Sequence, residues 1–224
     1  TFRSAGLLTI FVALTCTAEA ADKRFALIAP GSPLPRVVSG PRPLERDAAR
    51  DLCDYLSRIT RRSISVSDQA DQAPIVIHVG RDKFVEKHVP RIERIRADGY
   101  VIQCIEQGKS VHLVLAGKAD RAAQWAVEKF LADHCGVRWL FPDSVHGEVV
   151  PQRTTITLDR QLSQTIQPDF VNRSNCGMYY FTPPRKLLRL GPYGDGQYGN
   201  HAIQHIFSTK QFEEHPEWFA MFGG

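Results

Sequence analysis

The sequence of 224 residues lacks several patterns that would point directly to a function. Its five cysteines include no CxxC pair, which argues against a zinc ribbon or a thioredoxin-like redox site. It has no GxxxxGK[ST] string, so its glycine-rich stretches are not a phosphate-binding P-loop. Its formal net charge is only +4, and basic and acidic residues are interspersed, so no basic stripe indicates a nucleic-acid partner. The remaining apolar and charged fractions are those of a globular protein.

The N-terminal segment is typical of an export signal. Arg3 precedes an apolar run over residues 5–14, and Ala18-Glu19-Ala20 has the small-x-small pattern that a signal peptidase accepts. The run is too short to span a bilayer, so no membrane span is expected. We therefore expect residues 1–20 to be a signal peptide and the protein to be exported to the periplasm or the extracellular space. An apolar N-terminal strand and a lipoprotein site at Cys16 are the alternatives.

Cleavage after Ala20 would leave four cysteines, Cys53, Cys104, Cys135 and Cys176. An even number permits disulfides in an exported protein. The four are widely scattered, and each lies within an apolar pattern, so we expect buried free thiols.

Apolar residues at helical spacing predict two amphipathic helices. The first stripe comprises Leu44, Ala48, Leu52, Tyr55, Leu56 and Ile59. Pro43 and Glu45 fit the first turn of that helix. The second stripe comprises Ala123, Val127, Phe130, Leu131 and His134. Gly136 suits the left-handed residue that ends this second helix.

Short apolar segments predict strands at residues 25–29, 64–66, 75–79, 99–105, 111–116, 149–150 and 154–158. The segment 75–79 is almost continuously apolar, which indicates a strand covered on both faces. Gly80 and Asp82 then begin a short helix or turn. Segments 99–105 and 111–116 form the clearest hairpin, with Gly108 able to take positive φ in the connection.

These elements predict an α+β domain over residues 22–160, with two long helices packed on one face of a mixed β-sheet. Residues 161–167 are polar and lack strong periodicity, which favours a linker. Residues 168–173 have the pattern of a new strand, followed by a segment rich in Tyr and Gly. We interpret 161–224 as the linker and the truncated start of a (β/α) barrel, because a barrel needs about 200 residues or more.

The order of several motifs along the chain resembles a known module. They are the helix with Ala48, Leu52, Tyr55 and Leu56; Val79-Gly80; residues 98–102; Leu115-Ala116-Gly117; residues 136–142 (GVRWLFP); Val150-Pro151; and Pro168-Asp169-Phe170. The first domain resembles the N-terminal accessory module of family 67 α-glucuronidases, and a similar module precedes the barrel in family 20 β-hexosaminidases. One departure is plain, because Ala122-Ala123 follows Arg121 where those families have glycine. The C-terminal region, with His201, Phe207, Phe212 and residues 214–220, resembles the start of domain of unknown function 4838.

The resemblance implies an N-terminal fragment of an exported glycoside-hydrolase-like protein that acts on carbohydrate. Arg173 would lie at the C-terminal end of the first barrel strand and bind sugar hydroxyls, and His201 would line the same substrate site. The catalytic carboxylates would lie beyond residue 224, and no cofactor is implied. A non-catalytic carbohydrate-binding or structural module is the first alternative. The second is a metal-dependent hydrolase that uses His201, His205 and His215, of which the first two have the spacing of zinc ligands on a helix.

Overall fold

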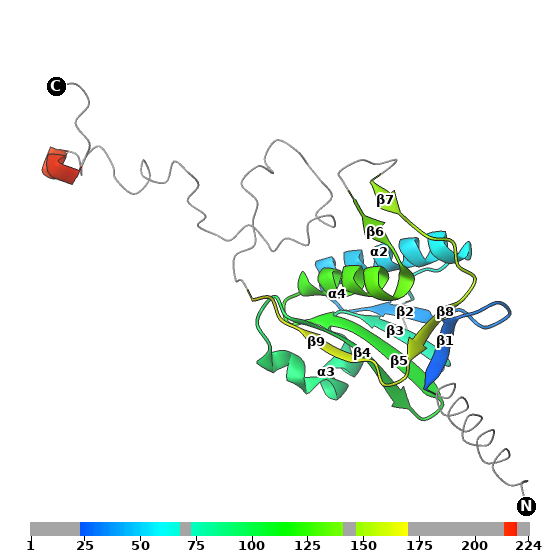
Figure 1. Ribbon diagram of the computed structural model, residues 1–224. Helices are drawn as coiled ribbons and strands as arrows, with labels where there is room; N and C mark the ends of the chain where they lie inside the picture. The colour runs from blue at the N-terminus through cyan, green and yellow to red at the C-terminus, as the bar shows by residue number, and fades with distance from the viewer. Residues whose placement is uncertain (1–22, 68–72, 141–146, 170–212, 219–224) are drawn as a thin grey trace, which may run out of the picture. The chain divides into compact units, whose positions relative to one another are not determined.

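The computed structural model describes residues 23–67, 73–140, 147–169 and 213–218, and the fold is centred on a five-stranded sheet (Figure 1). The strands follow the order β2 (Arg36–Ser39), β3 (Ile75–Val79), β5 (Ser110–Gly117), β4 (Tyr100–Gln107) and β9 (Ser163–Ile166). The pairs β2–β3 and β3–β5 are parallel, whereas β4 is antiparallel to both β5 and β9. The predicted mixed sheet is confirmed.

Two helices, α2 (Pro43–Thr60) and α4 (Ala122–Phe130), lie together on one face of this sheet (Figure 1). A π-helical turn, η2 (Leu131–Cys135), extends α4 by five residues. Gly136 follows it with φ of 80°, the left-handed conformation expected at a helix end. The structure thus confirms an α+β fold with two helices on one sheet face.

The main core lies between these helices and the sheet. Its fully buried large side chains include Leu27, Leu52, Leu56, Ile59, Ile77, Ile102, Leu113, Leu115, Phe130 and Leu131. Leu44, which we placed on the inward stripe of α2, is instead 44% exposed. The stripe begins one residue later, at the fully buried Glu45, so Leu44 is turned by about 100° toward solvent. His134 is half-buried and stacks on Phe130, with ring centroids 5.5 Å apart.

A second, smaller apolar cluster covers the other face of the sheet. There α3 (Lys83–His88) and the 3₁₀ turn η1 (Pro90–Arg94) pack on β4 and β5 (Figure 1). The cluster comprises Val85, Val89, Ile92, Ile95, Val101, Val114 and Ala116. Four of the five residues of β3 are buried, as expected for a strand covered on both faces.

The hairpin of β4 and β5 has the predicted form. Its register runs from Tyr100 opposite Gly117 to Gln107 opposite Ser110, and Gly108 takes φ of 61° in the connection. At the open end of the hairpin, Gly117 lies directly against Ala122, the first residue of α4. A Cβ added at Gly117 would lie 2.2 Å from the Cβ of Ala122. The absence of a side chain at Gly117 thus permits the close approach of β5 and α4.

Two pairs of short strands lie outside the main sheet. β1 (Arg24–Ile28) is antiparallel to β8 (Ile156–Asp159), and β6 (Arg138–Trp139) is antiparallel to β7 (Glu148–Val149). The predicted strand at residues 64–66 is wrong. Within the described residues only an isolated parallel bridge between Val66 and Val37 forms there, next to the hydrogen bond that the Ser67 amide donates to the Val37 carbonyl at 2.7 Å.

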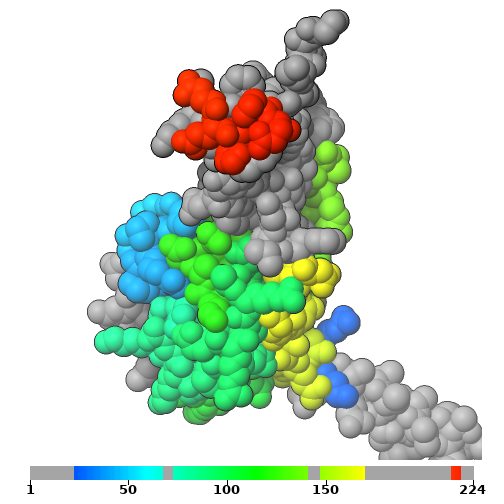
Figure 2. Space-filling view, turned by 90° about the vertical axis from the view of Figure 1, so that its left-hand side faces the viewer, coloured from blue at the N-terminus to red at the C-terminus, as the bar shows by residue number. Residues whose placement is uncertain are grey.

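The interpretation of residues 161–167 as a polar linker is also wrong, because Ser163–Ile166 forms the edge strand β9. As an edge strand, β9 is partly exposed to solvent, which accounts for its polar composition. Its Ile166 and the preceding Leu162 pack against the core. The space-filling view shows β9 at the surface beside the segment of α3 and η1 (Figure 2). The guanidinium of Arg91 donates to the Ser163 hydroxyl across this boundary, at 3.1 Å. The sheet therefore continues past residue 160.

The signal-peptide residues 1–20 and almost all of the predicted barrel start lie outside the described residues. Residues 213–218 form a short segment of their own, with a 3₁₀ turn, η3 (Pro216–Trp218). In the part of the chain that the structure describes, no helix has the length and apolar character needed to cross a bilayer.

Candidate functional site

The two predicted substrate-binding residues, Arg173 and His201, lie outside the described residues, as does His205. His215 is described, and its Nδ1 lies 3.1 Å from a carboxylate oxygen of Glu217. Within the described ranges, no group of three or more His, Cys, Asp or Glu side chains is arranged to hold a metal ion.

The most buried acid of this domain is Glu45, which links the start of α2 to the ends of β2 and β3. Its carboxylate is fully buried. It accepts from the Arg42 guanidinium at 2.7 Å, from the Arg42 amide at 3.2 Å and from the Arg81 amide at 3.0 Å. A Cβ on Gly40 or Gly80 would fall within 2.5 Å of this carboxyl group, so only glycine fits at both strand ends. Glu45 is thus a structural cross-link.

The other buried acids of the described residues also have partners within the fold. One oxygen of Asp98 accepts from both Nε and Nη2 of Arg121, at 3.1 and 3.0 Å, which ties the start of β4 to the start of α4. The Gln124 amide donates to Glu128 at 3.2 Å and to Asp51 on α2 at 2.9 Å. The Gln124 nitrogen thus bridges the carboxylates of Asp51 and Glu128, which belong to neighbouring helices.

The GVRWLFP motif makes a polar cluster with α2. The Trp139 indole donates to the Tyr55 hydroxyl at 2.9 Å, and that hydroxyl donates to Glu148 at 2.6 Å. The two rings meet edge to face, with centroids 5.7 Å apart. Burial, followed by the hydrogen bond to Glu148, raises the pKa of Tyr55 above its ordinary value. This phenol therefore stays protonated at neutral pH and donates its hydrogen bond to Glu148.

A chain of titratable side chains lies under α3. Asp82 caps that helix through the Val85 amide, at 2.9 Å, and its other oxygen lies 2.5 Å from Nδ1 of His78. Nε2 of His78 lies 2.9 Å from Nδ1 of His112, and both rings stack on Phe84. Burial opposes ionisation of Asp82, but its hydrogen bond and attraction to His78 outweigh that and lower its pKa.

Burial disfavours the charged form of His112 and therefore lowers its pKa. Burial, together with the nearby His78 and His88, lowers the pKa of His112 to about 4, so this imidazole is neutral at physiological pH. Phe84 stacks on both imidazole rings, and the arrangement joins α3 to β3 and β5.

Sequence analysis missed both buried networks. The signal for the histidine pair was present, because His78 and His112 each interrupt an otherwise apolar strand. Glu45 was assigned to the first helical turn, but nothing in its spacing indicated complete burial. The prediction of free thiols is confirmed for Cys53, Cys104 and Cys135, whereas Cys176 lies outside the described residues. Burial raises the pKa of Cys53 to about 11 and those of Cys104 and Cys135 to about 12, so these thiols are unreactive.

No protein-family model matches the chain, and no curated protein matches it. Solved structures of sugar-cleaving enzymes are similar to it. A family GH115 4-O-methyl-α-glucuronidase, BtGH115A, with specificity for decorated arabinogalactans, aligns with 66% of this chain at 16% identity and a TM-score of 0.47. A GH20 β-N-acetylhexosaminidase from Streptomyces coelicolor A3(2) aligns with 67% at 12% identity and a TM-score of 0.41.

A GH20 exo-β-N-acetylglucosaminidase from Vibrio harveyi, in complex with N-acetylglucosamine, aligns with 67% of the chain at 15% identity and a TM-score of 0.37. The aligned part is a minor portion of each enzyme. It covers 19% of the GH115 structure, 24% of the Streptomyces structure and 18% of the Vibrio structure.

Proposed function

We propose that the chain is the N-terminal part of an exported carbohydrate-active protein of the glycoside-hydrolase type. In this proposal the domain that ends with β9 is an accessory module without catalytic residues of its own. One observation carries it: the buried carboxylates of Glu45 and Asp98 link separate elements of the domain, and that of Glu128 accepts from Gln124 on the same helix.

The residues that carry the sequence resemblance to accessory modules support the proposal, because they occupy structural positions. Gly80 makes room for the Glu45 side chain, and Gly117 makes room for Ala122. Arg138 donates to the Ala132 carbonyl at 2.5 Å and so satisfies a backbone acceptor at the end of η2. Trp139 is held by Tyr55. These residues all have structural roles, as expected of an accessory module.

Cleavage of a glycosidic bond commonly requires an acid and a second carboxylate on opposite sides of that bond. We place these groups in the part of the protein that follows residue 224, on later strands of the proposed barrel. Arg173 and His201 would contribute contacts to sugar hydroxyls, for which the forked donors of arginine are suited.

The test compares this chain with a longer chain expressed from the natural reading frame. Both are assayed against a panel of nitrophenyl glycosides that includes α-glucuronides and β-N-acetylglucosaminides. We expect hydrolysis by the longer chain only, and we expect Arg173→Ala and His201→Ala in that chain to raise KM or lower kcat without changing thermal unfolding. Hydrolysis by the 224-residue chain, abolished by Glu45→Gln or Asp98→Asn without loss of folding, would refute the accessory role.

The same longer chain tests export and turnover. Expression in a Gram-negative host should give a periplasmic protein whose first residue, by mass spectrometry, is Ala21. Retention of residues 1–20 in the cytoplasm would contradict the export proposal. A longer chain that binds polysaccharide but releases no sugar from any substrate would favour the non-catalytic carbohydrate-binding alternative.

A further inference from the structure

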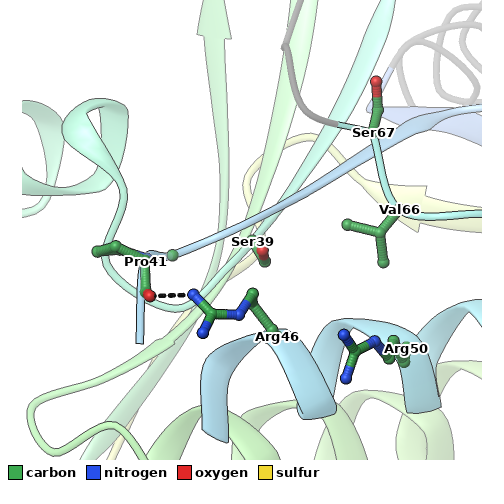
Figure 3. A pocket seen from close by; sticks show the side chains of 7 residues that line it. Ser39, Pro41, Arg46, Arg50, Val66 and Ser67 are labelled. Carbon is green, nitrogen blue, oxygen red and sulfur yellow. Dashed lines mark hydrogen bonds between the residues drawn. The ribbon is translucent and has the colours of Figure 1, made fainter. Parts of the chain in front are cut away.

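A pocket of about 370 Å³ opens at the carboxyl end of β2, beside the first turns of α2 (Figure 3). It is lined by Ser39, Gly40, Pro41, Arg46, Arg50, Val66 and Ser67. We propose that this pocket binds an oxyanion group, a carboxylate, sulfate or phosphate, carried by a ligand about the size of one sugar. The proposal does not depend on whether the protein cleaves glycosides.

Positive charge dominates the pocket. Arg46 and Arg50 are four residues apart on α2, so both project from the same side of the helix toward the opening (Figure 3). A third guanidinium, that of Arg36, donates to the Ser67 hydroxyl at 3.3 Å. Among the residues that the structure describes, the exposed acid in contact with these arginines is Asp47, which lies 2.8 Å from Arg50. The field at the opening therefore favours an anion.

The buried carboxylate of Glu45 lies behind Gly40 and does not cancel this field. Its charge is matched by the Arg42 guanidinium at 2.7 Å and by two backbone amides. Arg42 is not among the lining residues, so Arg46 and Arg50 remain in excess.

Hydrogen-bond donors are also left over in the pocket. Arg46 donates through one terminal nitrogen to the Pro41 carbonyl, and Arg50 donates through one to Asp47. A guanidinium carries five N–H donors, so each arginine retains several for a ligand. The Ser39 hydroxyl has no hydrogen-bond partner among the described residues. Paired guanidinium forks match the planar or tetrahedral oxygens of carboxylate, sulfate and phosphate.

The volume and the remaining wall define the size of the ligand. Pockets of roughly 300 Å³ and above accommodate small organic ligands. Val66 provides an apolar surface between the arginines and Ser67, against which a ring could lie. A bare ion would leave this wall uncovered, so the observations favour an anionic group on a larger molecule.

The experiment measures binding of sodium phosphate, sodium sulfate and sodium glucuronate to the 224-residue chain. Isothermal titration calorimetry at constant ionic strength, set with sodium chloride, gives the affinities. The test variant is R46Q/R50Q, which removes two charges from the pocket. The matched control is R24Q/R94Q, which removes two exposed arginine charges from β1 and η1. Thermal unfolding without added anion checks that both variants fold, and the single variant R50Q replaces R46Q/R50Q if it does not.

We expect millimolar binding of at least one probe, weakened about tenfold or more in R46Q/R50Q and unchanged in R24Q/R94Q. Tighter binding of glucuronate identifies a carboxylate on a sugar, and tighter binding of sulfate or phosphate identifies a sulfated or phosphorylated ligand. Absence of binding by all three probes, or equal loss in the test and control variants, would overturn the proposal.

Discussion

His78 on β3 and His112 on β5 lie in contact on the sheet face that α3 covers, with Nε2 of one ring 2.9 Å from Nδ1 of the other. Both are nearly inaccessible to solvent, at 1% and 9% exposure. The groups that surround His112 are His78, His88, Asp82 and the ring of Phe84. Burial, together with the nearby His78 and His88, disfavours the charged form of His112 and lowers its pKa, so this side chain makes stability depend on pH.

We predict that the protein loses stability as pH falls from about 6.5 to about 4. The folded-state pKa of His112 is lowered from 6.5 to about 4, so the unfolded state takes up a proton in this range and the folded state does not. A neutral His112 therefore contributes its full stability above pH 6.5. Each pKa unit corresponds to about 1.4 kcal/mol, which gives a loss of up to about 3 kcal/mol at pH 4. Urea denaturation at half-unit pH intervals measures it.

The variant His112→Gln should flatten this dependence between pH 6.5 and 4, because the titrating group is gone. His215→Gln, which alters an exposed histidine of the 213–218 segment, is the control and should leave the slope unchanged. Below pH 4 a further loss is expected in all variants, since the pKa of Asp82 is lowered and its ionised form stabilises the fold. Equal slopes in wild type and His112→Gln would contradict this account.

A second prediction concerns Glu45. Glu45→Ala removes the acceptor for the Arg81 amide and the partner of Arg42, so buried donors lose their hydrogen bonds. The free energy of unfolding should fall by about 2–4 kcal/mol. Glu45→Gln keeps the shape and one acceptor oxygen, and it should cost about half as much. Chemical denaturation of both variants at pH 7 provides the comparison.

Asp47→Ala is the matched control, since Asp47 is also on α2 but its side chain is 59% exposed in an ion pair with Arg50. It should change stability by less than about 0.5 kcal/mol. A cost for Glu45→Ala no larger than that of the control would show that the carboxylate is not needed at the strand ends.

The parts of the fold that could be predicted are those specified by local patterns. Periodicity located α2, and alternation with Gly108 located the hairpin, because each burial pattern repeats within one segment. The edge strand β9 was missed because its pairing partner, β4, lies about 60 residues earlier and its own residues are polar. An isolated bridge formed at Val66 where a strand was predicted, since a segment as short as Ile64-Ser65-Val66 does not specify a neighbouring strand.

The functional groups were harder to predict than the elements that carry them. Glu45 can be buried only because Gly40 and Gly80, at the ends of β2 and β3, leave room for its side chain. Both glycines lie beside the start of α2 because β2 and β3 are parallel neighbours. The contact of His78 with His112 depends on the register of β3 against β5. The arginine pocket likewise joins α2 to residues 66 and 67. Long-range register of this kind is not encoded in any short window of sequence.

A third prediction concerns how much the buried Phe130 side chain contributes to the stability of the main core. Phe130 is fully buried between α4 and the sheet. Phe130→Ala removes a large apolar side chain and leaves a cavity, so unfolding should become easier by about 3–5 kcal/mol in urea. Leu140→Ala, at a site that is 58% exposed, should cost less than about 1 kcal/mol. A loss below about 1 kcal/mol for Phe130→Ala would show that the inward face of α4 is misassigned.

The fourth prediction concerns the contact of Gly117 with Ala122. In Gly117→Ala the new Cβ would lie 2.2 Å from the Cβ of Ala122 and 2.7 Å from its carbonyl carbon, so strand and helix must separate. We expect a loss of about 2–3 kcal/mol. Gly108→Ala meets no atom within 4 Å and is strained only by its φ of 61°, so it should cost about 1 kcal/mol.

Removing the Ala122 methyl group, which faces Gly117, tests the same contact from the helix. Ala122→Gly alone should cost about 1 kcal/mol, because glycine weakens the first turn of α4. Combined with Gly117→Ala it should cost less than the sum of the two single changes, since one of the colliding methyl groups is gone. Recovery is expected to be partial, because the backbone of Ala122 would still lie within 3 Å of the new Cβ. Strict additivity in the double-mutant cycle would show that Gly117 and Ala122 do not make the close approach between β5 and α4.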